Sequence, residues 1–496
     1  MAGRARCATR DSMLDPAFTS ALAAIVPGEA LLTSAEDTRP YECDGLTLYR
    51  ELPAAVVLPD DEAQVVRILE LCHAARVPVV ARGAGTSLSG GALPIADGVV
   101  LSLAKFRRIV SIDPLSRTAV VEPGVRNLAV SEAAAACGLF YAPDPSSQIA
   151  CSIGGNVAEN AGGVHCLKYG LTVHNVRKVR GVLVTGEIVE FGSDALDAPG
   201  YDLLALVTGS EGLLAVITQV TVKLLPKPRE ARVVLAAFDD LEKAGAAVGA
   251  VIGAGIIPGG LEMMDQPATR AVEPFVHAGY PLDAAAVLLV EADGTPEEVE
   301  SEIAEIRQVL TAGGATSLRV SADEAERLLL WSGRKAAFPA VGRISPDYYC
   351  IDGTIPRAAL PRVLAQIEAW SRDYGLPCAN VFHAGDGNLH PLILFDAEKP
   401  GDKERTIEFG DRILELCIEV GGTITGEHGV GIEKIRGMCA QFPPGALERF
   451  HGVKRAFDER ALLNPGKGVP TLARCAEFGR MHVHAGALPH PDLPRF

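Results

Sequence analysis

The sequence has no C-x-x-C pair, although it contains 11 cysteines spread over 496 residues. Without such pairs we expect neither a disulfide framework nor a set of iron–sulfur ligands in this chain, and we expect reduced thiols in a cytosolic protein. No run of about 18 apolar residues is present, so no membrane-spanning helix is expected. The N-terminal stretch MAGRARCATRDSMLDPAF contains arginines but no apolar core, so we expect no secretory signal.

Positive charge is also scarce, because 46 lysines and arginines face 62 aspartates and glutamates and leave a net charge of −16. No basic run stands out, which argues against nucleic acid or an anionic membrane surface as a partner. Hydrophobic residues make up 48% of the chain and charged residues 22%, as in ordinary soluble proteins. The length allows more than one domain, each with a large core.

Short strands and helices alternate along the chain, which predicts an α+β fold. Apolar runs predict strands in the first half at 54–59, 77–81, 98–103 and 118–125. Apolar residues spaced by three and four predict helices at 61–77, 127–138, 295–314, 323–342 and 356–375. Because strands and helices also alternate in the second half, we expect an antiparallel sheet there with helices on one face, of the ferredoxin-like type.

Two glycine-rich stretches in the first half suit one long ligand with phosphates in its middle. The first has four glycines between Gly83 and Gly91. Gly83-Ala-Gly85 resembles the start of a dinucleotide motif, but Leu88 stands at the third glycine position and no good helix follows, so a Rossmann fold is disfavoured. Glycines still allow backbone N–H groups to converge on a phosphate. The second stretch, from Pro143 to Gly163, is predicted to form another loop.

The stretch His383-Ala-Gly-Asp-Gly-Asn-Leu-His390 predicts a hairpin with a two-residue type I′ turn at Asp386-Gly387. Pairing outward from that turn places His383 opposite His390, with their Cβ atoms ~4.5–5.5 Å apart. Two imidazoles at this separation can bind one metal ion, although a hydrogen-bonded pair of histidines is the alternative.

A glycine-rich loop downstream of this hairpin carries Glu427 and His428. We expect the two stretches to meet, with His383, His390 and Glu427 as metal ligands and His428 as a spare base. Two histidines and one carboxylate leave an open coordination position, as in catalytic metal sites. These ligand types do not decide between zinc, manganese and iron.

Several motifs resemble those of vanillyl-alcohol-oxidase-type flavoproteins, which have a PCMH-type FAD-binding domain. The stretches RGAGTSLSGG, PDPSSQIACSIGGNVAENAGG and GSEGLLAVIT resemble that domain. FHAGDGNLHP, TGEHGVG and LLNPGKG resemble the FAD-linked oxidase C-terminal domain. YECDGLTLYR, CLKYGLTVHN, GRKAAFPAVGRISPDYYCIDGTIPR and RCAEFGRMHVH are similar, more narrowly, to the FAD-binding D subunits of glycolate oxidases (glycolate dehydrogenases).

This resemblance implies FAD bound between two small α+β subdomains and covered by a cap domain. The implied division is a helical lead-in at 1–50, the FAD-binding domain at 51–228, the cap at 229–459 and a returning segment at 460–496. The residues implied around the pyrophosphate are Arg82, Gly83, Gly85, Thr86, Gly90 and Gly91. Those implied beside the ribityl chain and ring are Pro143, Asp144, Gly154, Gly155, Asn156, Asn160 and Gly163. Those implied toward the adenine are Glu211, Gly212 and Ile217, and Asn464 is implied to return to the flavin.

The first glycine stretch departs from the family at Ser87, where relatives more often carry glycine. Serine is small, so we expect little effect. Some family members attach FAD through a histidine in this loop. Thr86 and Ser87 follow the glycines here, so non-covalent FAD is expected.

The resemblance also implies a mechanism, the oxidation of glycolate or a similar 2-hydroxy acid to the 2-oxo acid, with hydride passing to flavin N5. Arg334 would pair with the substrate carboxylate, because a planar guanidinium suits it. The metal would lower the pKa of the substrate hydroxyl, and His428 would take the hydroxyl proton. Related dehydrogenases carry a lysine shortly after this arginine, whereas the stretch from Tyr348 to Asp352 has none. Tyr348 or Tyr349 would then donate instead.

The resemblance further implies partner proteins, a second flavin-type subunit and an iron–sulfur subunit of a glycolate oxidase complex. We expect a cytoplasmic protein, with any attachment to the inner membrane made through those subunits. Two alternatives stay open: a D-lactate or other D-2-hydroxy-acid dehydrogenase that acts alone, and a non-catalytic subunit that only relays electrons through its flavin. The tail GRMHVHAGALPHPDLPRF suits a surface tail better than a partner-docking segment.

Overall fold

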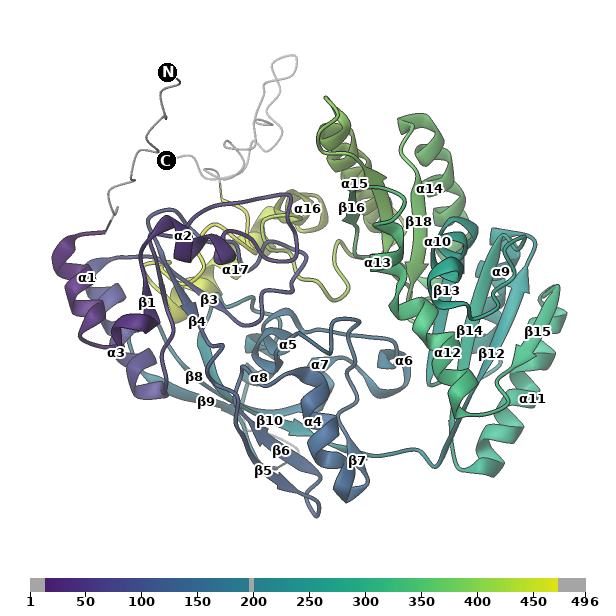
Figure 1. Cartoon of the computed structure of the whole chain (residues 1–496), viewed down its shortest axis with the longest axis horizontal. Helices are drawn as coiled ribbons and strands as arrows, with labels where there is room; N and C mark the ends of the chain where they lie inside the picture. The colour runs from purple at the N-terminus through teal and green to yellow at the C-terminus, as the bar shows by residue number, and fades with distance from the viewer. Residues whose placement is uncertain (1–13, 196–199, 472–496) are drawn as a thin grey trace, which may run out of the picture.

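The structure is a computed structural model that describes residues 14–195 and 200–471. Its main elements form three sheets, two in the first half and a larger one in the second (Figure 1). The motif RCAEFGRMHVH, the C-terminal tail and the first 13 residues lie outside the described part. Within the described residues, no helix is long and apolar enough to cross a membrane.

The first sheet has four strands in the order β1-β2-β4-β3. These strands are β1 (Leu31–Leu32), β2 (Ala55–Val57), β4 (Val99–Ser102) and β3 (Val79–Arg82). The pairs β2–β4 and β4–β3 are parallel, and the crossover helix α3 (Glu62–Ala75) packs on them together with α1 (Pro16–Ala23). The segment before residue 50 is therefore not only helical as predicted, because β1 adds a strand that pairs with β2.

The second sheet has five strands, all antiparallel to their neighbours, in the order β5-β6-β10-β8-β9. They are β5 (Ile109–Asp113), β6 (Thr118–Val121), β10 (Val216–Lys223), β8 (Val176–Val182) and β9 (Ile188–Gly192). Apolar side chains of the short helices α4 (Asn127–Ala134), α5 (Ile153–Glu159) and α8 (Leu203–Val207) pack on this sheet. The remaining elements of this half are α2 (Ala35–Thr38), α6 (Cys166–Tyr169), α7 (Thr172–Asn175), β7 (Leu139–Phe140) and its partner β11 (Leu225–Pro226).

The third sheet has seven antiparallel strands in the order β15-β12-β14-β13-β18-β20-β16. Its strands are β12 (Glu230–Phe238), β13 (Gly260–Asp265), β14 (Ala286–Gly294), β15 (Ser317–Val320), β16 (Asp347–Cys350), β18 (Cys378–Phe382) and β20 (Pro391–Phe395). Its helices are α9 (Leu241–Gly253), α10 (Gln266–Val276), α11 (Pro296–Ala312), α12 (Glu324–Lys335), α13 (Ala337–Val341), α14 (Leu360–Tyr374) and α15 (Asp402–Glu419). The antiparallel α+β arrangement predicted for this half is confirmed.

Helices cover both faces of the third sheet, so the prediction of helices on one face is wrong. Helices α9, α11, α14 and α15 pack with Val234, Ala236 and Phe238, on one face of β12. Helices α10, α12 and α13 pack with the alternate residues of β12, on the other face. The sequence carries this signal, because β12 is apolar without alternation over VVLAAF, as strands buried on both faces are.

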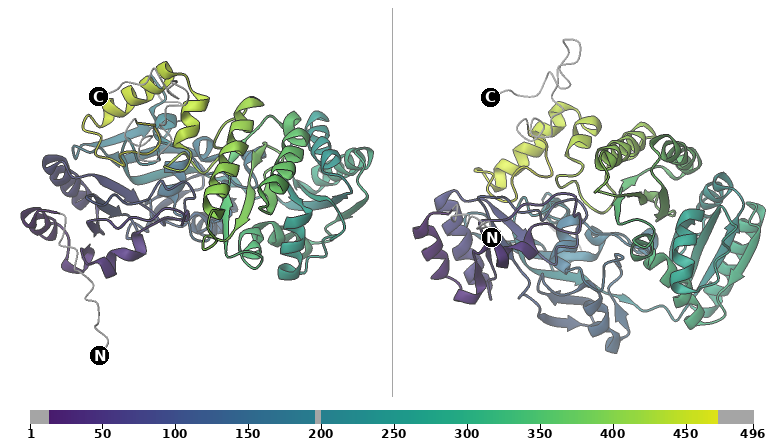
Figure 2. Two further views of the ribbon diagram at one scale, coloured as in Figure 1. Left: turned by 90° about the horizontal axis from the view of Figure 1, so that it is seen from above. Right: turned by 45° about the horizontal axis from the view of Figure 1, so that its top comes forward.

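The chain returns to the first half before the predicted boundary at 460. Helix α16 (Ile435–Gln441) packs beside α15, and helix α17 (Pro444–Phe457) carries the chain back to the second sheet, where Val453 and Phe457 pack (Figure 2). The N–H groups of Val430 and Gly431 already bond to Glu211 in the first half. Leu463 then pairs in parallel with Val79 at the edge of the first sheet. The division into domains stays a prediction.

A buried cluster of charges joins the first half to the third sheet. His165 lies between two carboxylates, with its Nδ1 2.9 Å from Asp144 and its Nε2 3.1 Å from Glu291 on β14. Arg327 on α12 donates to the other oxygen of Glu291 at 2.7 Å, and the indole N–H of Trp331 donates to it too. Burial alone would raise the pKa of Glu291, but His165, Arg327 and Trp331 lower it to about 2.

Glu291→Gln should therefore lower the free energy of unfolding by about 3 kcal/mol at pH 7, because it removes the buried carboxylate that His165 and Arg327 share and leaves each with only one ion-pair partner, Asp144 and Glu324. The Glu291 pKa falls from 4.5 to about 2 on folding, so its stabilising charge is complete above pH 4.5 and is lost as the pH falls toward 2. In urea unfolding, the difference in free energy of unfolding between the wild type and the variant should shrink as the pH falls over that range. Glu300→Gln, at an exposed position of α11, is the control. A loss under about 1 kcal/mol at pH 7 would contradict the ion-pair account.

Candidate active site

The predicted hairpin is present, but its turn is longer and its register differs. His383 pairs with Asn388 through two backbone hydrogen bonds of 3.1 and 3.2 Å, around a turn at 384–387. The predicted pairing of His383 with His390 is therefore wrong. The physical reason is that the Gly387 N–H also bonds to the carbonyl of His383, at 3.1 Å, so that the turn holds four residues. Strand β19 (Asn388–Leu389) pairs with β17 (Gly353–Thr354) on its other side.

The two histidines nevertheless meet, because His383 follows β18 and His390 precedes the neighbouring strand β20. Their ring centroids are 5.1 Å apart, and both Nε2 atoms face Glu427 Oε1, at 3.2 Å from His383 and 2.9 Å from His390. The structure thus brings together the three predicted ligands, whose donor atoms lie within 4.8 Å of one another. Both histidines are buried.

Glu262 on β13 fixes the orientation of His383. Its Oε1 lies 2.7 Å from His383 Nδ1, so a proton on Nδ1 leaves Nε2 as the free donor atom. This carboxylate–histidine contact is the outer contact that metal-binding histidines usually have, and the donor set therefore fits a metal ion. Sequence reasoning missed Glu262, because it lies 121 residues before His383 and no local pattern connects them.

Arg334 forms a buried ion pair with the same carboxylate. Its Nε donates to Glu262 Oε2 at 2.6 Å, and both side chains are only 1% exposed. Its Nη1 and Nη2 have no hydrogen-bond partner among the described residues. A buried guanidinium with two unpaired nitrogens is costly alone and suits an anionic ligand.

Asp352 holds the loop that carries Glu427 and His428. Its Oδ2 accepts the N–H groups of Gly426 and His428, both at 3.0 Å, and its Oδ1 accepts that of Glu427 at 3.2 Å. Lys434 Nζ lies 2.9 Å from Oδ2, and both side chains of this ion pair are fully buried. Burial alone would raise the pKa of Asp352, but Lys434 holds it well below its usual range.

His428 stacks on His390 with ring centroids 4.9 Å apart and an angle of 8° between the rings. Burial lowers the pKa of His428 to about 4, an effect that Asp352 opposes and that His390 and Lys434 strengthen. The ring is therefore neutral near pH 7 and can accept a proton. Its Nδ1 has no hydrogen-bond partner among the described residues.

A cavity of about 530 Å³ connects the glycine-rich stretches with this cluster. Its volume falls in the range of small-molecule and cofactor sites. The predicted FAD-contacting residues that line it are Arg82, Gly83, Gly85, Thr86, Ser87, Gly91, Gly154, Gly155, Asn156, Glu211, Gly212 and Ile217. At its other end the lining residues are Lys335, Phe338, Tyr348, His390, Glu427 and His428.

Two models of protein families match the chain: the C-terminal domain of FAD-linked oxidases at residues 227–468 and an FAD-binding domain at 53–192. The glycolate oxidase subunit GlcD of Escherichia coli (strain K12) is 63% identical over 96% of each chain. This chain belongs to the GlcD family of FAD-linked oxidases. The Bacillus subtilis (strain 168) GlcD is 39% identical over 86% of this chain and 91% of its own. A D-lactate dehydrogenase of Anaerostipes hadrus is 32% identical over 88% and 94%.

Solved structures show the same fold at low sequence identity. A 4-ethylphenol oxidase from Gulosibacter chungangensis has a TM-score of 0.78 at 17% identity and covers 94% of this chain and 99% of its own. A p-cresol methylhydroxylase has a TM-score of 0.78 at 17% identity, over 92% and 97%. The family membership and these folds make the chain an FAD-binding oxidoreductase with a PCMH-type architecture.

Six of the predicted FAD-contacting residues of this FAD-linked oxidase do not line the cavity: Gly90, Pro143, Asp144, Asn160, Gly163 and Asn464. Asn464 supports the cavity wall, because its side-chain amide donates to the carbonyl groups of Gly91 and Glu211. Asp144 binds His165 instead, and Asn160 ends α5 in the left-handed conformation with φ 55°.

The second glycine-rich stretch is not entirely the loop that was predicted. Residues Gly154, Gly155 and Asn156 lie in the first turn of α5, which begins at Ile153. A Cβ at Gly154 would stand 3.1 Å from the carbonyl oxygen of Pro123, closer than real Cβ contacts usually are. The glycine therefore serves close packing of this turn against a neighbouring loop as well as access to the cavity.

Ser87 has a larger structural role than its small size suggested. Its hydroxyl donates to Glu159 Oε1 at 3.0 Å, across 72 residues of sequence. Glu159 lines the cavity beside Glu211, and burial together with Glu211 raises the pKa of Glu159 well above its usual range. Both carboxyl groups lie against Gly429, the residue after His428. Sequence reasoning missed Glu159 as a site residue.

The two tyrosines that were left as alternatives are neighbours on strand β16 and point to opposite faces of the sheet. Tyr348 lines the cavity, where its ring contacts Phe338 at a centroid distance of 5.8 Å. Tyr349 points to the opposite face of the sheet and is 3% exposed in the core there. Only Tyr348 therefore lies where it can contact a ligand of the cavity.

Asp352→Asn should lower the free energy of unfolding by about 3–5 kcal/mol, because it removes the nearer counter-charge of buried Lys434, at 2.9 Å, and leaves only Glu433 at 3.8 Å. Asp352→Asn combined with Lys434→Met should recover part of that loss. Chemical denaturation of the two single variants and the double variant measures the coupling. Exposed Asp283→Asn is the control. The assigned ion pair would be contradicted if the double variant lost as much stability as Asp352→Asn alone, or as much as the two single variants together.

Proposed function

We propose that this chain oxidises glycolate to glyoxylate and passes the hydride to FAD, as one subunit of a larger enzyme. The observation that carries the proposal is that His390, Glu427 and His428 line the same cavity as the glycine-rich stretches of the FAD-binding domain. A substrate held by these side chains would face the cofactor. The high identity to proteins named glycolate oxidase subunits supports glycolate as the substrate.

His383, His390 and Glu427 would hold a divalent cation, for which zinc, manganese and iron all suit two imidazoles and a carboxylate. The contact of His383 Nδ1 with Glu262 supports this role, because it directs Nε2 toward Glu427. When bound, the cation supplies a Lewis acid that lowers the pKa of the substrate hydroxyl. The buried surroundings of both histidines exclude water from two of the three donors.

Arg334 and His428 would act directly on the substrate. The unpaired Nη1 and Nη2 of Arg334 are two parallel donors, which match a carboxylate. Neutral His428 takes the hydroxyl proton as general base. FAD held by the glycine-rich stretches would supply the hydride acceptor, and loss of the hydroxyl proton to His428 and of one hydride from C2 would turn the 2-hydroxy acid into the 2-oxo acid. Tyr348 takes the place of the lysine of related dehydrogenases as a further donor.

The glycine-rich stretches would hold FAD without a covalent bond. Thr86 and Ser87 follow the first glycines, so that loop offers no histidine for attachment. The residues of the stretches that line the cavity would surround the pyrophosphate, ribityl chain and ring, with Glu211 and Ile217 toward the adenine.

Electrons would leave FAD through partner subunits in the cytoplasm, since the sequence has no iron–sulfur motif of its own. The relatives named glycolate oxidase subunits support a complex, with a second flavin-type subunit and an iron–sulfur subunit as the proposed partners. Any contact with the inner membrane would then be made by those subunits.

A D-2-hydroxy-acid dehydrogenase that acts alone, for example on D-lactate, is the second candidate, favoured by the 32% identity to a D-lactate dehydrogenase. The aromatic rings of Phe338 and Tyr348 both line the cavity and contact each other, and two bulky rings at this place would favour the smaller glycolate. The convergence of His383, His390 and Glu427 beside His428 argues against a subunit that only relays electrons.

Anaerobic addition of glycolate should bleach the bound flavin, because hydride transfer reduces FAD. Glycolate, D-lactate and D-2-hydroxyglutarate should be compared as reductants, with glycolate expected to be the fastest. The His428→Ala variant should retain FAD but bleach about 10²–10⁴-fold more slowly, the usual contribution of a general base. His73→Gln, on α3 away from the cavity, is the control. A flavin that stays oxidised with all three acids would leave only an electron-relay role.

Arg334→Lys should raise the KM for glycolate about 10–100-fold, since a charged hydrogen bond contributes about 1.5–3 kcal/mol. Lysine lacks the two parallel N–H donors of the planar guanidinium. Flavin content and bound metal, measured by absorbance and elemental analysis, should stay unchanged. Arg343→Lys, at an exposed position after α13, is the matched control. An unchanged KM with altered metal content would instead assign Arg334 only to the support of Glu262 and His383.

A further inference from the structure

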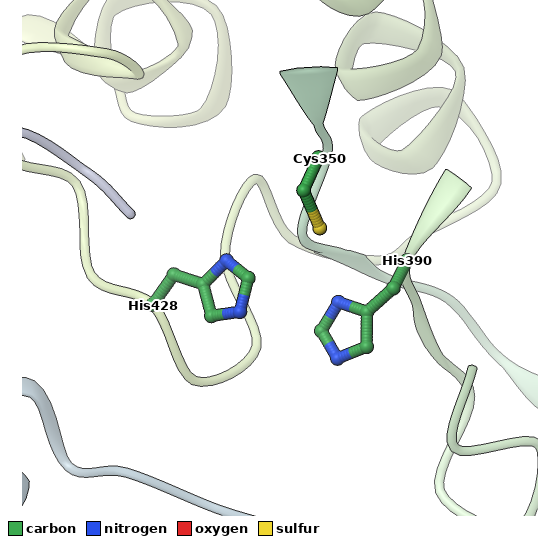
Figure 3. Close-up of side chains that lie close together, drawn as sticks. All are labelled: Cys350, His390 and His428. Carbon is green, nitrogen blue, oxygen red and sulfur yellow. The ribbon is translucent and has the colours of Figure 1, made fainter. Parts of the chain in front are cut away.

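A second group of metal-binding side chains lies beside the proposed catalytic ligands. Cys350, His390 and His428 each offer one donor atom, and these atoms lie within 4.8 Å of one another. Figure 3 shows the Cys350 thiol, at the end of β16, pointing into the space between the His390 and His428 rings. Cys350 is 4% exposed and His390 is 2% exposed, so the group is closed off from bulk solvent on this side.

The free ring nitrogens of the two histidines belong to this second group. His390 uses Nε2 for its contact with Glu427, whereas its Nδ1 is buried and has no hydrogen-bond partner among the described residues. His428 Nδ1 is likewise buried and unpartnered in that part of the chain. A buried polar atom without a partner costs about 1–3 kcal/mol. Two such nitrogen atoms beside one thiol therefore indicate a bound group, such as a cation, that accepts electron pairs from nitrogen and sulfur.

We propose that Cys350, His390 and His428 form a binding site for a thiophilic divalent cation, Zn²⁺ or Cd²⁺, that is distinct from the proposed catalytic metal site. One sulfur and two imidazole nitrogens are a donor set that zinc takes in proteins, with a fourth position for water or substrate. Softer sulfur ligands select such cations over Mg²⁺ or Ca²⁺. On binding, the cation forms a bond to Cys350 Sγ, and the thiol proton leaves to solvent.

Occupation of this site would inhibit the enzyme, an expectation that rests on the proposed function. His428 would give its lone pair to the cation and could no longer take the substrate proton. A neutral imidazole offers only one ring nitrogen to a metal, so a His390 that binds this cation would no longer be a ligand of the His383–His390–Glu427 set. The site is therefore a point at which an excess of a thiophilic metal stops hydroxy-acid oxidation.

X-ray absorption of the FAD-loaded full chain with one equivalent of Cd²⁺ tests the binding. The expected shell has one sulfur and two nitrogens in wild type, and the sulfur is lost in Cys350→Ala and replaced by oxygen or nitrogen in Cys350→Ser. Cys378→Ala is the matched control, because Cys378 is a buried cysteine on β18 outside the histidine cluster. Retained sulfur in both Cys350 variants, or a shell without sulfur in wild type, would overturn the proposal.

Flavin bleaching by glycolate in the presence of Cd²⁺ tests the inhibition. Cd²⁺ should inhibit wild type and Cys378→Ala at concentrations at least about tenfold lower than Cys350→Ala, since even outer-shell changes cost metal affinity by that factor. Equal inhibition of all three proteins would overturn the inhibitory role. If untreated protein is not bleached by glycolate, the proposed function fails, whereas the cadmium–sulfur shell can still be measured.

Discussion

One buried carboxylate, that of Asp352, fixes the part of the molecule on which the site depends. It accepts backbone N–H groups from three consecutive residues, which fixes the backbone that carries Glu427 and His428. Such a loop has few hydrogen bonds of its own, so its shape must come from a partner. Lys434 keeps that partner ionised in the protein interior, where burial alone would neutralise it.

The same loop also ties the two halves of the molecule together. Glu427 reaches both histidines of the third sheet with one oxygen and the N–H of Gly162 in the FAD-binding half with the other, at 2.9 Å. Glu211 binds the next residues of the loop from the same half. The His165 cluster adds a second buried connection. The proposed metal ligands and the cavity therefore cannot shift relative to each other without breaking buried, charge-assisted hydrogen bonds.

Local sequence patterns predicted the elements well, and long-range partners poorly. Helix α11 is a clear success, since a helix was predicted at 295–314 and the observed one has Thr295 as its N-cap. The motif around His383 correctly indicated which side chains meet, although the pairing used to reach that result was wrong, because the Asp-Gly pair alone does not distinguish the four-residue turn from a two-residue turn. Glu262, Asp352 and Glu159 act across 72 to 121 residues, and no periodicity encodes such contacts. Their burial as carboxylates becomes informative only once the fold is known.

Four unpartnered atoms gather at this one site: Arg334 Nη1 and Nη2, His390 Nδ1 and His428 Nδ1, each without a hydrogen-bond partner in the described chain. At about 1–3 kcal/mol each, they would be a large cost in a fold whose total stability is about 5–15 kcal/mol. A purely structural cluster would have lost this cost through substitution to apolar residues. Their grouping around His383, His390 and Glu427 instead fits a site whose polar groups are completed only when an anionic substrate and cations are bound.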